Sequence, residues 1–228
     1  MRSLSWLLIS LCLALDARAQ ATPPARIEIE FELKRNGKTM AEVVEVLEQR
    51  NGAYVLVETW KGKGVYALLG RAKRTSQGSV GAHGPRPHEY TDERSGRDTQ
   101  RVSIDWKANT ITRRYKGQTR TEPVPADTQD RLSFLLALSY AAGKGKPISF
   151  HVVDARGMSF HTYTPQGIGR VVTPAGEFDT VTLMRRNEGS GETAEIFHAA
   201  KLGYLPVRIV VTEKDGTRFE HMATRISQ

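Results

Sequence analysis

Cysteine is nearly absent from this sequence, because Cys12 is the single one among 228 residues. One thiol cannot build a disulfide framework or supply a zinc site that needs several thiolates. The chain also lacks the common catalytic signatures, since it contains no G-x-S-x-G, S-x-x-K, H-E-x-x-H or G-x-x-x-x-G-K-[ST] pattern. We therefore expect no enzymatic activity, no cofactor and no metal site.

Long apolar runs are also missing, apart from Leu7–Leu15 near the start of the chain. This run follows a positive Met1-Arg2, precedes the small-x-small pattern Ala17-Arg18-Ala19, and is typical of a signal peptide. It is much shorter than the ~20 residues that span a bilayer. We expect residues 1–19 to be cleaved, leaving a short leader at 20–25 and a mature chain without a transmembrane segment.

Export has consequences for the thiol and for the charge. Cys12 leaves with the signal peptide, and the bulky Leu11 before it makes lipidation improbable. The formal charge of +8 falls to +7, because Arg2, Arg18 and Asp16 are lost. A cysteine-free exported chain suits the bacterial periplasm, where nucleic acid is not available. The expected partners are therefore an anionic envelope lipid, lipopolysaccharide or an envelope protein, and we expect a monomer.

The mature chain begins with strict alternation of apolar and charged residues. Residues 27–34 read IEIEFELK, which has the period of two of a half-buried strand. Asn36-Gly37 favours a type I′ hairpin turn, and Asn51-Gly52 repeats it. Residues 40–48 can be read as a helix, but the two flanking turns favour a strand.

The pattern recurs downstream. Residues 101–106 and 110–116 predict another hairpin, as do residues 207–212 and 219–226. Further strands are predicted near 147–154, 157–163, 168–173, 177–186 and 193–198. Short strands at close spacing indicate an antiparallel fold. We predict a mainly β protein, with residues 26–228 as one domain in which a meander forms a curved sheet, half-barrel or sandwich.

Two segments depart from the strand pattern. Residues 128–143 predict one central apolar helix, with Asp127 or Thr128 as its cap and Gly143 at its end. Residues 76–96 are rich in Gly, Pro and charge, so they predict a long exposed loop. We expect the helix to pack on the concave face of the sheet.

Several short motifs occur together in a familiar order. After the first strand come Gly84-Pro85-Arg86-Pro87, Asp130-Arg131-Leu132-Ser133, the turn at 172–180 and Leu205-Pro206-Val207-Arg208-Ile209. With these motifs, most of the mature chain resembles the DUF3108 family, an exported bacterial domain of unknown function. The resemblance implies export and a mostly β fold, and it implies no catalytic residues. A looser similarity is to periplasmic lipoprotein carriers, in which an incomplete barrel encloses an apolar cavity.

The first functional hypothesis is a non-catalytic periplasmic protein that binds an apolar or amphiphilic envelope ligand between the sheet and the helix. Its candidate apolar lining is Phe31, Leu33, Trp60, Trp106, Phe134, Leu135 and Leu138. Its candidate basic rim, which would meet anionic head groups, is Arg71, Lys73, Arg74, Arg113, Arg114 and Lys116. The sequence leaves open whether the apolar residues line a cavity or fill a solid core, and whether the basic ones are ordinary solvated strand faces.

Two alternatives remain. One is an envelope interaction module that binds a protein or glycan through strand edges and residues 76–96. The other is a hydrolase without a recognisable motif, because a Ser/His/Asp triad is defined by geometry. A three-residue turn at 155–157 would place His151 opposite His161 across a hairpin, where packing or a pH-sensitive pair is expected before a metal site.

Overall fold

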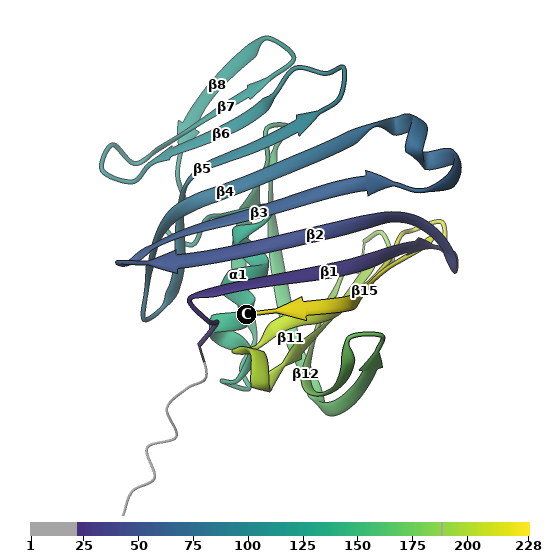
Figure 1. Cartoon of the computed structure of the whole chain (residues 1–228). Coiled ribbons are helices and arrows are strands. Elements are labelled where there is room, and N and C mark those ends of the chain that lie inside the picture. Colours follow the sequence, from purple (N-terminus) through teal and green to yellow (C-terminus); the bar gives the residue numbers. More distant parts are fainter. Residues whose placement is uncertain (1–21, 188) are drawn as a thin grey trace, which may run out of the picture.

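A computed structural model describes residues 22–187 and 189–228 (Figure 1). The predicted signal peptide, including Cys12, and the first residues of the leader lie outside the described residues. The strands are β1 (Arg26–Arg35), β2 (Lys38–Arg50), β3 (Ala53–Gly62), β4 (Arg71–Gly81), β5 (Gly84–Arg94), β6 (Gln100–Asp105), β7 (Thr110–Tyr115), β8 (Gln118–Pro123), β9 (Gln129–Asp130), β10 (Ile148–Val153), β11 (Met158–Thr173), β12 (Gly176–Arg186), β13 (Thr193–Ala199), β14 (Leu205–Thr212) and β15 (Arg218–Ser227). The helices are α1 (Ser133–Ala142) and two 3-10 turns, η1 (Gly64–Leu69) and η2 (Ala200–Leu202).

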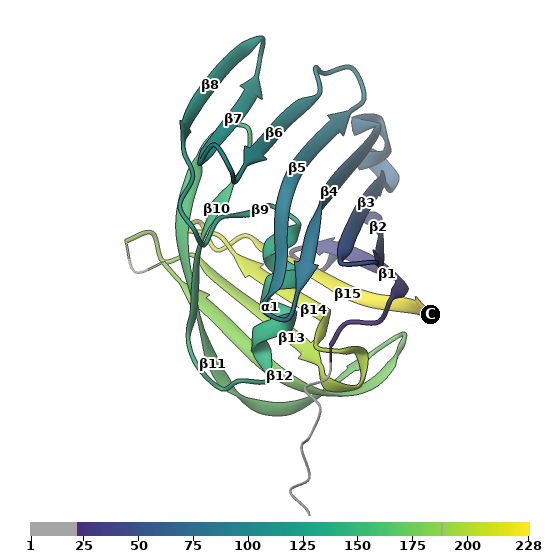
Figure 2. The ribbon, with the colours of Figure 1, turned by 90° about the vertical axis from the view of Figure 1, so that its left-hand side faces the viewer.

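All fifteen strands form one sheet in the order β8-β7-β6-β5-β4-β3-β2-β1-β15-β14-β13-β12-β11-β10-β9. Neighbours run antiparallel except β9 and β10, which are parallel. The first strand lies in the middle of the sheet, because β1 pairs with β2 on one side and with β15 on the other. Figure 2 shows the sheet bent into two halves with α1 between them, which confirms the predicted mainly β, curved-sheet fold.

Alternation explains the central strands. In β1 the buried side chains are Ile27, Ile29, Phe31 and Leu33, at most 4% exposed, with Glu residues between them. The turns at Asn36-Gly37 and Asn51-Gly52 have positive φ at both residues, as a type I′ turn requires. Residues 40–48 therefore form a strand, and the predicted meander is confirmed.

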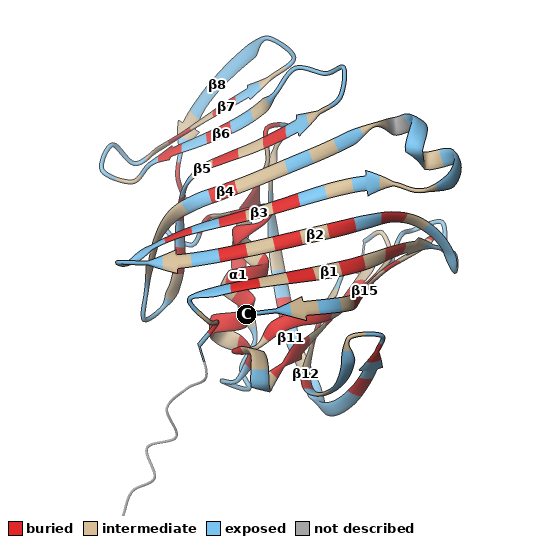
Figure 3. Cartoon of the chain, in the orientation of Figure 1, coloured by how far each residue is buried: buried red, intermediate tan, exposed pale blue. Residues whose placement is uncertain are grey.

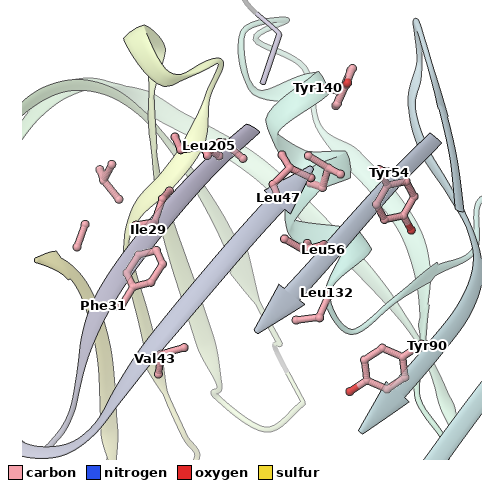
Figure 4. Packing of buried hydrophobic residues seen from close by; sticks show 14 of the residues in the cluster. Ile29, Phe31, Val43, Leu47, Tyr54, Leu56, Tyr90, Leu132, Tyr140 and Leu205 are labelled. Atoms are coloured by element: carbon pink, nitrogen blue, oxygen red, sulfur yellow. The ribbon is translucent and has the colours of Figure 1, made fainter. Parts of the chain in front are cut away.

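The main core lies between the inner face of the sheet and α1. Leu132, Leu136 and Tyr140 from the helix region share one buried cluster with strand residues such as Leu47 and Leu56 (Figures 3 and 4). Each fully buried aliphatic side chain stabilises the fold by roughly 1.5–3 kcal/mol. This burial holds the helix against the sheet.

The helix begins later than the sequence predicts. Residues 129–130 pair as β9 with β10, so α1 covers Ser133–Ala142 instead of 128–143. The Asp130 carboxylate accepts hydrogen bonds from the amides of Leu132 and Ser133, each at 2.8 Å, in place of the predicted cap. Its other oxygen accepts a 2.5 Å bond from the hydroxyl of Ser76 in β4. Asp130 therefore ties the start of the helix to the sheet.

The predicted exposed loop at 76–96 is wrong. These residues belong to the antiparallel hairpin β4–β5, inside the sheet. Of their five buried positions only Tyr90 carries a typical core residue, while the other four carry Ser76, Pro85, Pro87 and Asp92, so the alternation is hidden. The two prolines lie where β6 does not pair with β5, and there a missing amide is tolerated.

Candidate functional site

The seven candidate lining residues fall into two packed clusters. Phe31, Leu33, Trp60 and Trp106 belong to the main core cluster, with the two tryptophans only partly buried. Phe134, Leu135 and Leu138 belong to or pack on a second cluster with Phe150, Tyr163, Leu183 and Ile196. Leu33 and Leu138 are 2% and 0% exposed, so their side chains fill the space between the sheet and α1.

Trp60 borders an apolar cavity with a basic mouth. The cavity measures about 200 Å³ and lies where β3 ends and β4 begins. It is lined by Met40, Ala41, Trp60, Gly62, Tyr66, Gly70, Arg71, Ala72, Arg74, Arg94, Ser95 and Arg97. Four arginines around aromatic and aliphatic side chains give this cavity both chemical characters that an anionic amphiphile requires.

Glycine makes the turn beside this cavity possible. A Cβ at Gly62 would lie 2.1 Å from the carbonyl oxygen of Tyr66, so η1 can fold back on β3 only over a glycine. Gly70 ends η1 with φ at 75°, a conformation that L side chains rarely adopt. These two glycines place Tyr66 and Arg71 in the cavity wall.

Arg74 is held between two carboxylates on the inner face of the sheet. It lies opposite Glu58 on β3 and opposite Asp92 on β5. Its Nη1 donates to Glu58 Oε1 at 2.8 Å, while Arg94 Nη2 donates to Asp92 Oδ2, also at 2.8 Å. Burial opposes ionisation of Asp92, but the bonds from Arg94 and the charge of Arg74 hold its pKa below the usual value. Arg74 is thus a fixed cation.

The fixed cation lies over the indole of Trp60, with the guanidinium carbon 5.1 Å from the ring centroid. His221 meets the same ring edge-on at 5.6 Å, and burial lowers the His221 pKa, so this imidazole is neutral at pH 7. Trp60 Nε1 is buried and has no hydrogen-bond partner among the described residues. A buried donor without a hydrogen bond lowers the free energy of unfolding by about 1–3 kcal/mol. In this protein that donor belongs to Trp60, which lines the cavity.

Glu45 is a further buried acidic residue on this face. It lies opposite Glu58 across β2 and β3, and it is 8% exposed. Burial, followed by the charge of Glu58, raises the pKa of Glu45 to about 8. Its carboxyl group is therefore mainly neutral at pH 7.

The six predicted basic-rim residues do not form one rim. Arg71, Lys73 and Arg74 lie on β4, where Arg71 and Arg74 border the Trp60 cavity. Arg113, Arg114 and Lys116 lie at the end of β7, three strands away in the sheet order. There Arg113 is buried against Glu122 at 2.9 Å, and it borders a separate cavity of about 310 Å³ with Lys116, Arg120 and Arg156.

His151 and His161 are not opposite each other, so that prediction is wrong. The turn covers residues 154–157, and it pairs His151 with Phe160 and Phe150 with His161. This shift of one residue puts the two imidazoles on opposite faces. No group of three metal-ligating side chains occurs among the residues that the structure describes.

The hydrolase alternative requires a serine, a histidine and a carboxylate in contact, and β10 and β11 carry the nearest candidates. Ser159 Oγ lies 2.8 Å from His161 Nε2, but His161 Nδ1 is buried with no partner among the described residues. Burial and the charges of Arg185 and Arg131 lower the His161 pKa to about 4. Such an imidazole is a weak base at pH 7, and no carboxylate within residues 22–187 and 189–228 orients it. The imidazole of His151 instead meets Asp127 at 2.9 Å.

Sequence reasoning missed Glu58, Asp92, Arg94 and Arg97 as members of the site. A signal for Glu58 exists, because it continues the inner-face series Tyr54, Leu56 and Trp60 at alternate positions. Asp92 and Arg94 were hidden by the interpretation of 76–96 as a loop.

Comparisons with known proteins give a family and a distant fold likeness. A family model described as "Protein of unknown function (DUF3108)" matches residues 28–224. A candidate exported protein with a YmcC-like fold from Bacteroides fragilis is 11% identical, with 91% of this chain and 98% of that chain covered and a TM-score of 0.41. A candidate lipoprotein from Parabacteroides distasonis is 8% identical, with 90% and 97% covered and a TM-score of 0.38. No curated protein matches the sequence.

Proposed function

The chain belongs to the DUF3108 family of proteins of unknown function, and we propose that it binds an anionic amphiphile in the Trp60 cavity without catalysing a reaction. The apolar part of the ligand packs against Trp60, and its acidic group meets the arginines at the mouth. Export, predicted from residues 1–19, would make the anionic lipids and lipopolysaccharide of the envelope the available ligands.

The observation that carries this proposal is the combination of Trp60 with Arg71, Arg74, Arg94 and Arg97 around one cavity. Arg74 and Arg94 are already paired with carboxylates. Arg71 and Arg97 are exposed, and neither guanidinium makes an ion pair within residues 22–187 and 189–228. These two side chains are therefore free to bind an anion, and a guanidinium suits a phosphate or carboxylate group.

The size of the cavity limits the ligand. At about 200 Å³ it is smaller than the 300–1,000 Å³ typical of pockets for drug-sized molecules. It has room for a few methylenes against Trp60, with the acidic group at the mouth and the rest of a larger lipid outside. We therefore place the ligand in the Trp60 cavity. The space between the sheet and α1, where the sequence analysis placed it, is occupied by core side chains.

Calorimetric titration of residues 20–228 with n-octyl phosphate tests the proposal, with n-octanol and octyltrimethylammonium as comparison ligands. We expect saturable binding of the phosphate, weaker binding of the alcohol and none of the cation. The R71Q/R97Q double variant should bind the phosphate about tenfold more weakly, which corresponds to roughly 1.4 kcal/mol.

The matched control is Arg114→Gln, which removes an exposed arginine at the same end of the sheet but from the other basic group. It should bind n-octyl phosphate like the unchanged protein. Equal losses in R114Q and R71Q/R97Q, or equal affinity for the phosphate and the cation, would show that the Trp60 cavity is not a specific anion site.

A further inference from the structure

The 3-10 turn η1 presents apolar side chains to solvent. Val65 is 77% exposed and Leu68 is 91% exposed. Figure 1 shows this turn, in blue, at the outer ends of β3 and β4 and away from α1. In Figure 3 most of the described part of the turn has the colour of exposed residues. Isolated exposed apolar residues are common, but these two share one short turn at a tip of the molecule.

Basic side chains surround this tip. Lys61 is the second-last residue of β3, and Arg71 begins β4. Lys73 follows on the same face as Arg71, and Arg97 lies in the turn after β5. Arg71 and Arg97 also border a second, shallower cavity of about 460 Å³ with Lys73 on the other side of the strand ends. The cationic surface therefore continues around the end of the sheet.

Acidic groups offset only part of this charge. Glu42 lies opposite Lys61 in the sheet and forms an ion pair with Lys63 at 2.6 Å. Glu93 lies opposite Lys73, and Asp98 follows Arg97 in the chain. Asp92 is occupied by Arg74 and Arg94. No ion pair reaches Lys61 or Lys73 from any residue that the structure describes.

Folding accounts for only part of this arrangement. Glu42 faces Lys61 from β2, but Lys61 also lies directly opposite Arg71 on β4, and like charges at such positions destabilise an antiparallel pair. Val65 and Leu68 add almost no buried area to the core. A surface that combines exposed aliphatic side chains with unpaired cations is complementary to a layer of anionic head groups above hydrocarbon.

We propose that η1 docks on the surface of an anionic lipid bilayer. Val65 and Leu68 insert among the head groups, while Lys61, Lys73 and Arg97 meet lipid phosphates around them. The docking stands on the exposed tip and its charge, independently of the amphiphile bound in the Trp60 cavity. It brings the cavity, which is lined by Tyr66 of η1 and by the following Gly70, to the bilayer surface.

The bilayer is favoured over a protein partner because the apolar part of the tip is small. Specific protein interfaces usually bury at least 1,200 Å² in total and have an apolar centre. Two aliphatic side chains within a ring of cations suit an interfacial anchor better. No helix among the described residues is long and apolar enough to cross a membrane, so the contact proposed here is peripheral.

Co-sedimentation of residues 20–228 with vesicles tests the docking. We expect binding to vesicles of phosphatidylethanolamine with phosphatidylglycerol and no binding to vesicles of phosphatidylcholine alone. The V65S/L68S variant should bind the anionic vesicles about tenfold more weakly. The K61Q/K73Q variant should lose about thirtyfold, because each cation near the surface adds to the attraction.

Matched controls come from other exposed sites. I168S/V172S removes aliphatic side chains that are 88% and 72% exposed on β11. R50Q/K107Q removes exposed cations at the strand ends farthest from η1. Both control variants should bind anionic vesicles like the unchanged protein, and all variants should keep its circular dichroism and melting temperature.

Three outcomes would overturn the docking proposal. They are equal binding to neutral and anionic vesicles, unchanged binding by V65S/L68S, and concentration-dependent self-association in lipid-free sedimentation that V65S/L68S abolishes. Binding of n-octyl phosphate separates the two proposals. V65S/L68S should retain it if the Trp60 cavity works as proposed, whether or not the vesicles are bound.

Discussion

At the scale of single residues, charge on the inner face of the sheet shapes the candidate site. Glu58, Arg74 and Asp92 form one row on the inner face, across β3, β4 and β5. A buried ion pair adds little net stability. The ion pairs instead determine geometry, because the two carboxylates fix the Arg74 guanidinium over the Trp60 ring.

Trp60→Phe should weaken binding more than it weakens the fold. The substitution keeps an aromatic ring and removes an indole N–H that has no partner in the described structure, so the free energy of unfolding should change by less than about 1 kcal/mol. The affinity for n-octyl phosphate should fall about fivefold, because the smaller ring offers less apolar surface to the methylenes of the ligand. Urea unfolding and calorimetric titration measure the two quantities.

Trp106→Phe is the control for this prediction. Trp106 Nε1 donates a hydrogen bond to the carbonyl oxygen of Pro87 at 2.7 Å. Unlike the substitution at Trp60, this one therefore removes an existing hydrogen bond. W106F should therefore lower the free energy of unfolding by about 1 kcal/mol and leave the affinity unchanged. Unchanged affinity in W60F together with a loss of affinity in W106F would contradict the assignment of Trp60 to the site.

At the scale of elements, β4–β5 shows where sequence patterns stop being informative. Hairpins with Asn-Gly turns, such as β1–β2, were predictable because apolar and polar residues alternate along both strands and the turn residues favour positive φ. In β4–β5 the strands are held by close backbone approach at a bulge next to Gly78. That contact depends on two segments meeting, so no local pattern indicates it.

Gly78→Ala should destabilise the hairpin, because a Cβ at this position would lie 2.2 Å from the carbonyl oxygen of Arg86. Backbone must move to relieve that overlap, at a cost of about 2–3 kcal/mol in the free energy of unfolding. Gly81→Ala on the same strand is the control, since its Cβ would meet nothing within 4 Å. The free energies of unfolding of the two variants, measured by denaturant titration, should differ by most of this amount. Equal values would refute the close-contact explanation.

At the scale of the whole molecule, pairing of β1 with β15 joins the two ends of the chain, and the sheet folds around α1. Two acids are buried by this closure. Burial raises the pKa of Asp130 to about 6 and that of Glu45 to about 8. Each acid stays protonated in the folded state over a range where the unfolded chain has already released the proton.

The free energy of unfolding should therefore fall as the pH rises through this range. The unfolded chain binds fewer protons than the folded one below the folded pKa, so the derivative with respect to pH is negative there. Above about pH 6.5 Glu45 is the main contributor of the two acids. Its own contribution between about pH 6.5 and 9, read as the difference between the unchanged protein and E45Q, should be a loss on the order of 2 kcal/mol that levels off above its folded pKa.

Glu45→Gln should remove most of this slope, because glutamine does not ionise. Glu48→Gln, whose side chain is 60% exposed on the same strand, should leave the slope unchanged. Urea unfolding of the three proteins across this pH range measures the effect. A slope that persists in E45Q would assign the titration to another group.

The sequence by itself determined the mainly β class, most strands, the Asn-Gly hairpins and the apolar helix, because alternation and turn chemistry act between residues close in the chain. It also indicated Trp60, Arg71 and Arg74 as candidates. Only the tertiary structure decided that Phe134, Leu135 and Leu138 pack in the core, that β4–β5 is a hairpin, and which charges meet beside Trp60. Those outcomes depend on strand register and curvature, which bring together residues that are distant in sequence.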